Sequence, residues 1–350
     1  MKSILILYSK FDGKCTTGGQ VYEENMYNCM IENPDIEVER FGINRDNSFF
    51  NKLFSPVLNL TFIRKCRKHN IVIFNSSKHW HFIPLSFLLS LFSNTRVMII
   101  HHHFMHLEFS GFSRLFYQII ENLFLKTANH IITVSPYIYD ICKKKFRKHD
   151  VRLWPIPFSH ELIKQSNKTE DSNNLIYIGT IEPRKGLIYL LQSLTIIKQK
   201  GFNFKLDIIG KIKNQRYYDE LCTYIKANDL NVKFHGFVKS LEKDQMLKEA
   251  SIFVFPSLLE GYGMVLSEVM AFGLPIVCFN NSAMPYLVKT GKNGIVVANK
   301  DYRQMAEAIS SILIDPNLRR QLSEGSYSCA KKTITYNEYK TLLKEELKVL

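Results

Sequence analysis

The sequence predicts an α/β protein with two domains, each built on a parallel β-sheet. The chain has 350 residues, which is more than one compact core usually holds. Short runs of β-branched and apolar residues alternate with helical segments, as in parallel strands joined by crossover helices. A polar stretch near the middle divides these runs into two sets. The composition, 46% hydrophobic and 22% charged, excludes a disordered or collagen-like chain.

The expected elements follow from apolar patterning. In the first half, strands are expected at residues 4–8, 71–75, 96–101, 131–134 and 151–154. In the second half, strands are expected at 175–179, 204–209, 232–234, 252–255, 275–279 and 295–297. Helices are expected after the last strand, where apolar residues recur three and four apart, at 302–313, 317–323 and 337–349.

The domain boundaries follow the change in composition. We expect an N-terminal domain over 1–160, a polar linker over 161–174, a second domain over 175–333 and a closing helix over 334–350. Ligands of open parallel sheets bind outside the carboxyl ends of the strands. The loops that follow the strands are therefore where a site is expected.

The charge balance favours an anionic partner. Lys and Arg outnumber Asp and Glu by 46 to 32, a formal charge of +14. Nucleic acid, anionic lipid and phosphorylated substrates are the classes considered. A nucleic-acid binder needs a basic, aromatic-lined face or a recognised module, and the sequence shows neither. The seven scattered cysteines contain no Cys-x-x-Cys pair, which indicates a reducing cytosol rather than a disulfide framework or thiolate metal site.

No membrane-spanning helix is predicted. The longest apolar stretch, 82–92, is about half of the ~20 residues needed to cross a bilayer. The apolar start of the chain, 1–8, is too short for a signal peptide and is expected to be a strand. Membrane contact would have to be peripheral, through an amphipathic surface at 85–92 or 112–125. Buried helices would show the same pattern.

Two carboxylates surround the start of a helix that follows the strand at 252–255. Glu260 precedes this helix, and Glu268 lies about one turn inside it. Gly261 and Gly263 allow a ligand to approach the backbone, while the helix dipole and its first N–H groups attract phosphate. Glu268 can accept hydrogen bonds from a vicinal diol such as ribose. A capping glutamate and a solvated helix charge would show the same spacing.

A second loop, after the strand at 175–179, carries two cations. Lys185 would meet a diphosphate as a point charge, and Arg184 could bind it bidentately. A third loop, 235–238, would flank a base, and Gly236 would permit close packing there. The cations, helix terminus and diol acceptor together indicate a sugar nucleotide as the ligand.

Two features of the first half point to the same edge of its sheet. The glycine-rich turn 16–20, which includes Gly19, opens a helix expected to begin near Val21. The strand at 96–101 ends in a group of four histidines, His101, His102, His103 and His106. A metal site is one interpretation of this group. However, adjacent strand residues face opposite sides, and no suitably spaced carboxylate or thiolate accompanies the histidines, so no metal is expected.

The run 257–277 closely resembles the Glu-x7-Glu signature of the family 4 retaining glycosyltransferases, which adopt the GT-B fold. The resemblance implies two Rossmann-like domains facing across a cleft, with the C-terminal helix packing back on the N-terminal domain. It implies that Glu260 contacts the donor sugar's hydroxyls, that Glu268 holds the ribose and that Lys185 binds the diphosphate. The donor-binding set implied by these loops is Gly19, Gly179, Arg184, Lys185, Gly236, Gly261, Tyr262, Gly263, Met264, Val265 and Glu268.

The chain departs from the family pattern at several positions. The family often has arginine after the glycine where this chain has Thr180, and Arg184 can supply that charge. Met284-Pro285-Tyr286 stands where the family often has a Pro-Glu pair, and residues 154–157 replace the usual Asn-Gly turn at the hinge. Family members often carry a histidine near the reacting sugar. His102 is the first candidate and His101 the next, and sequence does not decide whether these or His103 face the cleft.

The resemblance implies a retaining transfer of a hexose-type sugar from a UDP- or GDP-sugar to a glycan or lipid-linked acceptor, with Glu260 and His102 as catalytic residues. Surface polysaccharide or lipopolysaccharide synthesis is the expected process. Neither a cofactor nor a metal is expected, and the expected location is the cytoplasm or the inner face of the membrane. The alternatives are a non-catalytic donor-binding subunit, and an epimerase or phosphorylase on the same fold.

Overall fold

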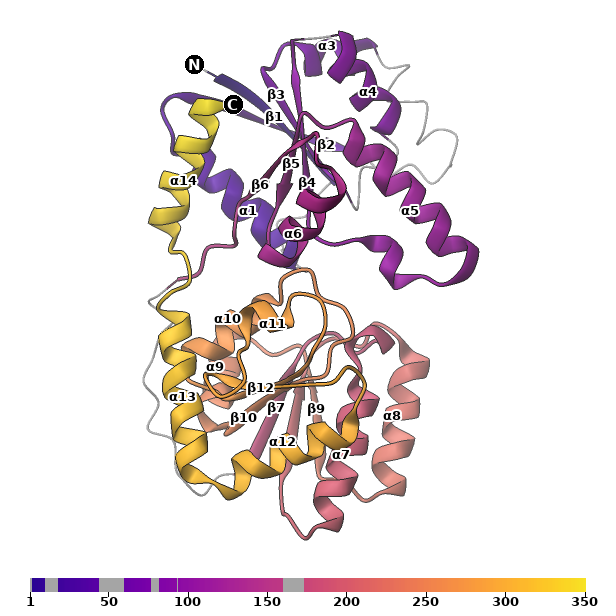
Figure 1. The fold of residues 1–350 in the computed structure, drawn as a ribbon, viewed down its shortest axis with the longest axis vertical. Helices are drawn as coiled ribbons and strands as arrows, with labels where there is room; N and C mark the ends of the chain where they lie inside the picture. Colours follow the sequence, from indigo (N-terminus) through magenta and orange to yellow (C-terminus); the bar gives the residue numbers. More distant parts are fainter. Residues whose placement is uncertain (1, 10–17, 44–59, 77–81, 93, 160–172) are drawn as a thin grey trace. The chain divides into compact units, whose positions relative to one another are not determined.

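The computed structural model describes residues 2–9, 18–76 without 44–59, 82–159 without 93, and 173–350 (Figure 1). The chain forms two compact units. The first comprises Met1–Pro157 together with Ile334–Leu350, and the second comprises Phe158–Thr333. The linker predicted at 161–174 lies, apart from its last two residues, outside the described part of the chain, and residue 174 already begins a strand.

The first unit is built on a parallel six-stranded sheet with the order β2-β1-β3-β4-β5-β6. The strands are β1 (Lys2–Ser9), β2 (Ile36–Ile43), β3 (Ile71–Asn75), β4 (Arg96–His101), β5 (His130–Thr133) and β6 (Asp150–Leu153). The four inner strands are continuous apolar runs, because helices cover both faces of a parallel sheet.

Strand β2 was not predicted from the sequence. It alternates charged and apolar residues and includes Glu37, Glu39 and Arg40. It is an edge strand with β1 as its sheet neighbour, so its side chains are partly exposed and can be polar. A search for buried apolar runs misses a strand of this kind.

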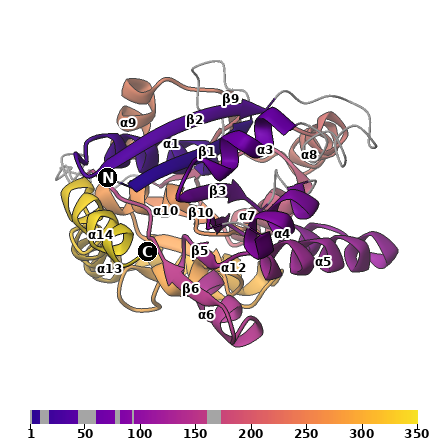
Figure 2. The same cartoon turned by 90° about the horizontal axis from the view of Figure 1, so that it is seen from above.

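The helices of the first unit lie on the two sides of this sheet. They are α1 (Gly18–Ile31), α3 (Leu60–Arg67), α4 (Ile83–Phe92), α5 (Gly111–Lys126), α6 (Pro136–Lys145) and α14 (Tyr336–Val349), with a 3-10 turn at Met105–Glu108. Helices α3, α4 and α5 group at one side of the sheet, and α1 and α14 at the other (Figures 1 and 2). Helix α1 begins at Gly18, earlier than the expected start near Val21, because the glycines form its first turn.

The C-terminal helix α14 packs on the first unit, as predicted. The Tyr339 hydroxyl donates to the Tyr22 hydroxyl, which in turn donates to the carbonyl oxygen of Trp154, both at 3.1 Å. All three side chains are buried. Arg152 of β6 pairs with Glu346 at 2.8 Å. The helix therefore joins α1 to the end of β6 through a buried hydrogen-bonded chain.

The second unit contains a second parallel six-stranded sheet, with the order β12-β11-β10-β7-β8-β9. Its strands are β7 (Asn174–Ile178), β8 (Lys205–Ile209), β9 (Val232–Gly236), β10 (Ile252–Phe255), β11 (Ile276–Phe279) and β12 (Gly294–Val297). Its helices are α7 (Leu187–Gln199), α8 (Gln215–Ala227), α9 (Ser240–Glu249), α10 (Met264–Ala271), α11 (Met284–Leu287), α12 (Tyr302–Ile314) and α13 (Pro316–Ala330). Helix α13 continues to Ala330, well beyond the predicted end at residue 323.

The order of this sheet creates a switch point between β7 and β10. The chain runs outward from β7 through β8 to β9, then returns to the other side of β7 and runs outward through β10 to β12. The loops after β7 and β10 therefore follow adjacent strands at the switch point, which is where ligands of open parallel sheets bind. Among the described residues no helix is both long and apolar enough to cross a membrane.

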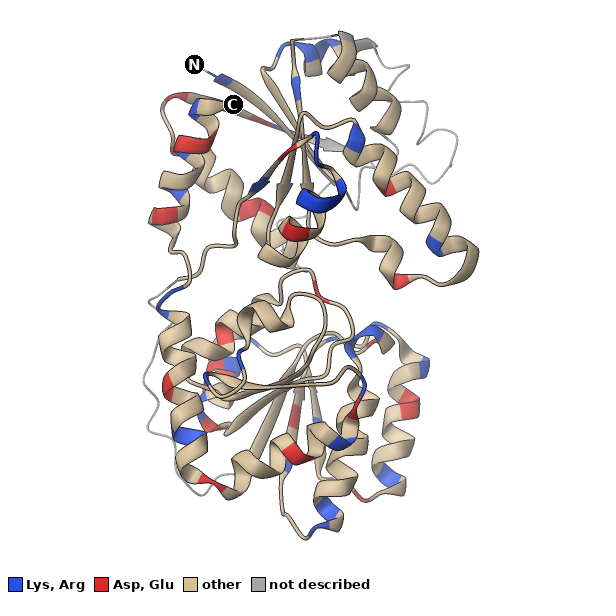
Figure 3. Cartoon of the chain, in the orientation of Figure 1, with Lys and Arg blue, Asp and Glu red and all other residues tan. Residues whose placement is uncertain are grey.

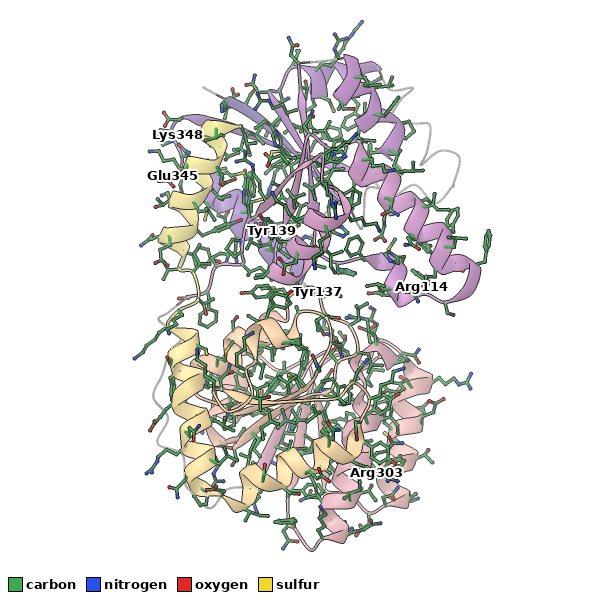
Figure 4. All side chains as sticks on the ribbon, viewed as in Figure 1. Arg114, Tyr137, Tyr139, Arg303, Glu345 and Lys348 are labelled. Carbon is green, nitrogen blue, oxygen red and sulfur yellow. The ribbon has the colours of Figure 1, made fainter. Side chains whose placement is uncertain are left out.

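The docking of α14 can be tested by Tyr339→Phe. This change removes the hydrogen bond to Tyr22 inside an otherwise unchanged packing, and we expect it to cost about 1 kcal/mol of stability. Hydrogen exchange of the α14 amides should accelerate accordingly. Glu345→Gln, on the exposed side of the same helix (Figure 4), is the matched control and should leave exchange unchanged. Equal exchange in both variants would contradict the structural role of the hydroxyl chain.

Candidate functional site

The loops that follow β7 and β10 are bound together at the switch point. The amide of Leu258 donates to the carbonyl oxygen of Arg184 at 2.9 Å, and the Arg184 guanidinium donates to the carbonyl oxygen of Leu259 at 2.7 Å. Gly186 has φ +66°, and a Cβ there would lie 2.1 Å from the carbonyl oxygen of Pro256. Only glycine allows this approach. The two loops therefore form one rigid group.

Lys185 and Glu260 form an ion pair at the centre of this group. Lys185 Nζ lies 2.5 Å from Glu260 Oε1, and Ser257 Oγ donates to the same oxygen at 2.7 Å. The two side chains are only 12% and 11% exposed. Burial alone would raise the pKa of the Glu260 carboxyl, but the charges of Lys185 and Arg184 and the two hydrogen bonds outweigh it and lower that pKa. Glu260 is therefore an anion with a cation beside it.

Arg184 is held in position by other residues of the loop that follows β7. Its guanidinium donates to Glu182 Oε1 at 3.1 Å and lies 3.9 Å from Glu260 Oε1. Thr180 Oγ1 also donates to Glu182 Oε1, at 2.8 Å. Thr180, which replaces the arginine frequent in the resembled family, thus helps to fix the residue that brings a charge to the same loop.

Helix α10 begins beside the ion pair. Gly263 precedes it with φ +86°, and no side chain caps its first turn. Gly261, Met264 and Val265 are half-buried around this turn, whereas Tyr262 is buried. The exposed amide groups at such a helix start attract anions. Glu268 lies one turn further along and pairs with Lys243 of α9 at 2.7 Å.

Glycines occupy the carboxyl ends of three adjacent strands. The amide of Gly179 donates to Ile209 at 2.9 Å, and that of Gly210 donates to Gly236 at 2.8 Å. A Cβ on Gly210 would lie 1.8 Å from the carbonyl oxygen of Gly179. Sequence reasoning singled out Gly179 and Gly236 but missed Gly210, because its requirement arises from a neighbouring strand.

In the first unit, His102 lies beside the start of α1. Its Nε2 is 3.8 Å from the position that a Cβ on Gly19 would take, and 3.8 Å from Glu23 Oε1. Its ring packs edge-on against Tyr22 at 5.4 Å. Asn75, at the end of β3, donates to the Glu23 carboxylate. Sequence reasoning missed Glu23 and Asn75, which complete a polar group at this edge of the sheet.

His101 has a different environment from His102. It is fully buried, its Nδ1 lies 2.7 Å from Ser76 Oγ, and its ring packs against Phe104 at 4.3 Å. Burial, reinforced by the charges of neighbouring histidines and Lys145, lowers its pKa well below the ordinary value. His101 is therefore a neutral core residue, and His102 is the histidine at the polar group.

The other two histidines of the group face different partners. His103 lies 3.4 Å from Glu108, and His106 Nδ1 lies 2.6 Å from Glu121 Oε2. Across the described parts of the chain, no group of three or more His, Cys, Asp or Glu side chains is arranged to hold a metal ion.

The predicted site residues thus fall into two groups. The second unit brings together Arg184, Lys185, Glu260 and the start of α10, with Glu268 on the same helix and Gly179 and Gly236 at neighbouring strand ends. Gly19 and His102 meet in the first unit. Sequence reasoning missed Ser257 and Lys243 as partners of the two glutamates. Ser257 stands inside the recognised run, whereas nothing local to the sequence links Lys243 to Glu268.

The fold is that of the GT-B glycosyltransferases. Sucrose-phosphate synthase from Thermosynechococcus elongatus superposes with a TM-score of 0.82 over 99% of this chain and 98% of its own, at 16% identity. HepE from Anabaena, in complex with UDP and glucose, gives a TM-score of 0.75 over 100% of both chains, at 17% identity.

The family comparison concerns the second unit. Residues 158–328 match the family described as glycosyl transferases group 1, which covers nearly all of that unit. The second-unit residues of the site described above, including Lys185, Glu260 and Glu268, therefore lie within the matched part of the chain.

Two curated relatives that match part of the chain are described as glycosyltransferases of polysaccharide biosynthesis. The capsular polysaccharide biosynthesis glycosyltransferase CapM of Staphylococcus aureus is 29% identical over 48% of this chain and 44% of its own length. The putative colanic acid biosynthesis glycosyltransferase WcaL of Escherichia coli is 29% identical over 39% and 35%. The chain spans about half the length of the curated relatives that it matches.

The ion pair can be tested through the pH dependence of stability. The lowered pKa of Glu260 means that its contribution is complete above the ordinary glutamate pKa of 4.5 and is lost as the pH falls through the folded-state value. Glu260→Gln should lower the free energy of unfolding by about 1 to 3 kcal/mol at pH 7. As the pH is lowered from 6 into the acid range, the thermal midpoint of Glu260→Gln should also fall less than that of the unsubstituted protein.

Glu307→Gln provides the control, because Glu307 is exposed on α12. This variant should keep both the stability and the acid dependence of the unsubstituted protein. If Glu260→Gln and Glu307→Gln gave the same pH profile, the ion pair would not contribute to folding as described.

Proposed function

We propose that this chain is a retaining glycosyltransferase that takes a hexose-type sugar from a UDP- or GDP-sugar. The observation that supports this most directly is the Lys185–Glu260 pair beside the start of α10, at the switch point of the second sheet. A cation, an anion and a helix terminus at one point suit a ligand that carries both phosphates and hydroxyls.

The proposed donor contacts follow from this geometry. The diphosphate lies between Lys185 and the first amides of α10, with Arg184 nearby as a second charge. When the diphosphate takes the contact with Lys185, the oxygen of Glu260 that now accepts from Lys185 becomes available to a sugar hydroxyl. Glu268, further along α10, accepts from the ribose hydroxyls. The glycine-lined strand ends at Gly179 and Gly236 leave room for the rest of the nucleotide.

The proposed mechanism is same-face substitution. The bond between the anomeric carbon and the diphosphate oxygen breaks while the acceptor oxygen bonds to that carbon, and the acceptor's proton passes to the departing phosphate. Lys185, Arg184 and the helix start stabilise the charge that develops on the leaving group. Glu260 is held by Lys185 and Ser257, which suits hydrogen bonding better than covalent attack. His102 is the proposed contact of the first unit with the reacting sugar.

The proposed acceptor is a glycan or a lipid-linked saccharide. The support comes from relatives described as acting in capsular and colanic acid biosynthesis, and from one described as an O-antigen chain mannosyltransferase. We propose surface polysaccharide or lipopolysaccharide synthesis as the process.

Donor binding is the first test of this proposal. UDP- and GDP-sugars should be screened by thermal shift, since a bound donor stabilises the folded state. Lys185→Ala should weaken the binding of the donor that gives a shift by about 10- to 100-fold, because it removes a charged hydrogen bond to the diphosphate. Lys226→Ala, an exposed lysine of α8, is the control and should bind the donor normally. Absence of a shift with every donor would contradict the assignment.

Transfer itself is tested by Glu260→Ala. We expect donor binding to persist and turnover to fall by about 100-fold or more, because a contact to the reacting sugar is lost. NMR of the product should show that the anomeric configuration is retained. Turnover should continue in the presence of a chelator, since no metal is assigned a role. Unchanged turnover in Glu260→Ala, inversion at the anomeric carbon, or loss of turnover on chelation would each contradict the mechanism.

A further inference from the structure

Helices α4 and α5 of the first unit carry a solvent-facing apolar surface. On α5 the exposed residues Phe112, Leu115, Phe116, Ile119 and Leu123 recur at spacings of three and four, so they lie on one face of the helix. The opposite face is buried through Glu121, Phe124 and Leu125. Phe112 is 82% exposed. The helix thus presents apolar residues where a surface helix normally presents polar ones.

Helix α4 extends this surface. Its exposed residues Phe87, Leu88 and Leu91 also lie close to one face. The helix is fixed to the end of α5 by a hydrogen bond between Ser86 Oγ and Thr127 Oγ1 at 2.7 Å. Together with Phe109, these residues account for nine of the seventeen exposed large hydrophobic side chains in the described part of the chain. Such clustering on two neighbouring helices marks an interaction surface rather than ordinary scattered exposure.

Most of the charges around this surface are cationic. Exposed Lys126 ends α5 on its apolar side, three residues after Leu123, whereas exposed Arg114 (Figure 4) lies in the first turn, on the side opposite Phe112 and Phe116. The carboxylate of Glu121 is the one acidic group in helices α3, α4 and α5, and it is buried where it accepts from the amide of Met105 and pairs with His106. Helices α3, α4 and α5 therefore carry no exposed negative charge among their described side chains, and the exposed carboxylate of Glu108, which precedes Phe109, lies 3.4 Å from His103.

Helix α3 adds further cations beside α4. Phe62 of α3 packs against Phe82, the residue before α4, with ring centroids 5.8 Å apart. Arg64 and Arg67 of α3 and the following Lys68 are exposed. Blue segments mark lysines and arginines on α3 and α5 in Figure 3.

We propose that the α4–α5 surface docks on an anionic membrane. The face defined by Phe87, Leu88, Leu91, Phe109, Phe112, Leu115, Phe116, Ile119 and Leu123 enters the boundary between headgroups and acyl chains, and Lys126 and the α3 cations contact lipid phosphates. A membrane fits this combination better than a protein partner, because it matches a strip of aromatic and aliphatic side chains flanked by positive charge on Lys126 and α3. The biological role rests on the proposed function, since docking would bring the enzyme to a lipid-linked acceptor.

The test is co-sedimentation of the full chain with vesicles. We expect binding to phosphatidylcholine vesicles that contain phosphatidylglycerol, weaker binding to phosphatidylcholine alone, and weakening by salt. The triple substitution Phe112→Ser, Phe116→Ser, Ile119→Ser should reduce partitioning at least about ten-fold. Lys126→Glu should reduce binding to the anionic vesicles specifically. The replaced side chains are exposed, so circular dichroism and thermal unfolding should stay unchanged.

The control replaces three exposed apolar side chains elsewhere in the chain. Leu241→Ser, Ile314→Ser, Val349→Ser should bind vesicles as the unsubstituted protein does. No vesicle binding, or equal binding by both triple variants, would overturn the proposal. So would a dimer in light scattering that the first triple variant dissociates, because a second copy would then cover the face. The donor thermal shift, measured on the same variants, separates these outcomes from failure of the proposed function.

Discussion

The order of strands in the second sheet is the constraint on which the candidate site depends. Since β7 and β10 are neighbours although about 75 residues separate them in sequence, the loops that follow them meet. Their junction is so close that Gly186 contacts the backbone of Pro256. Lys185 and Glu260 thereby come within ion-pair distance, and Glu260 lies four residues before α10 begins at Met264. The charged side chains, the helix start and the glycine-rich backbone lie together because the order in which the chain adds strands to the sheet reverses at this place.

The ion pair also shows how a site can be stable before it binds a ligand. Glu260 is nearly buried, and an isolated carboxylate there would be costly. Lys185, Arg184 and Ser257 compensate for that cost. An anionic ligand that competes for Lys185 would have to replace this compensation with hydrogen-bond donors of its own, such as hydroxyls. The partly buried Lys185–Glu260 pair would therefore both stabilise the fold and favour ligands that can take over its contacts.

In the first unit, too, segments that follow neighbouring strands bring polar side chains together. The end of β3, the residues after β4 and the start of α1 place Asn75, His102 and Glu23 together, while His101 turns into the core. Helix α14, the last segment of the chain, closes this unit through Tyr339 and Glu346. Residues from both ends of the chain thus support one core, and its outer helices α4 and α5 are left with an apolar face toward solvent.

The sequence by itself determined what depends on neighbours along the chain. The buried strands and the glycine-rich loops followed from local patterning, and the run around Glu260 was specific enough to indicate a ligand class. Tertiary structure decided what depends on distant partners. The edge strand β2 has too much exposed surface for an apolar run, Gly210 is required by Gly179 on another strand, and Lys243 meets Glu268 only after folding. Periodicity also could not decide between His101 and His102. Nor could it show that α4 and α5 expose apolar residues, because a helical pattern does not say which face the core covers.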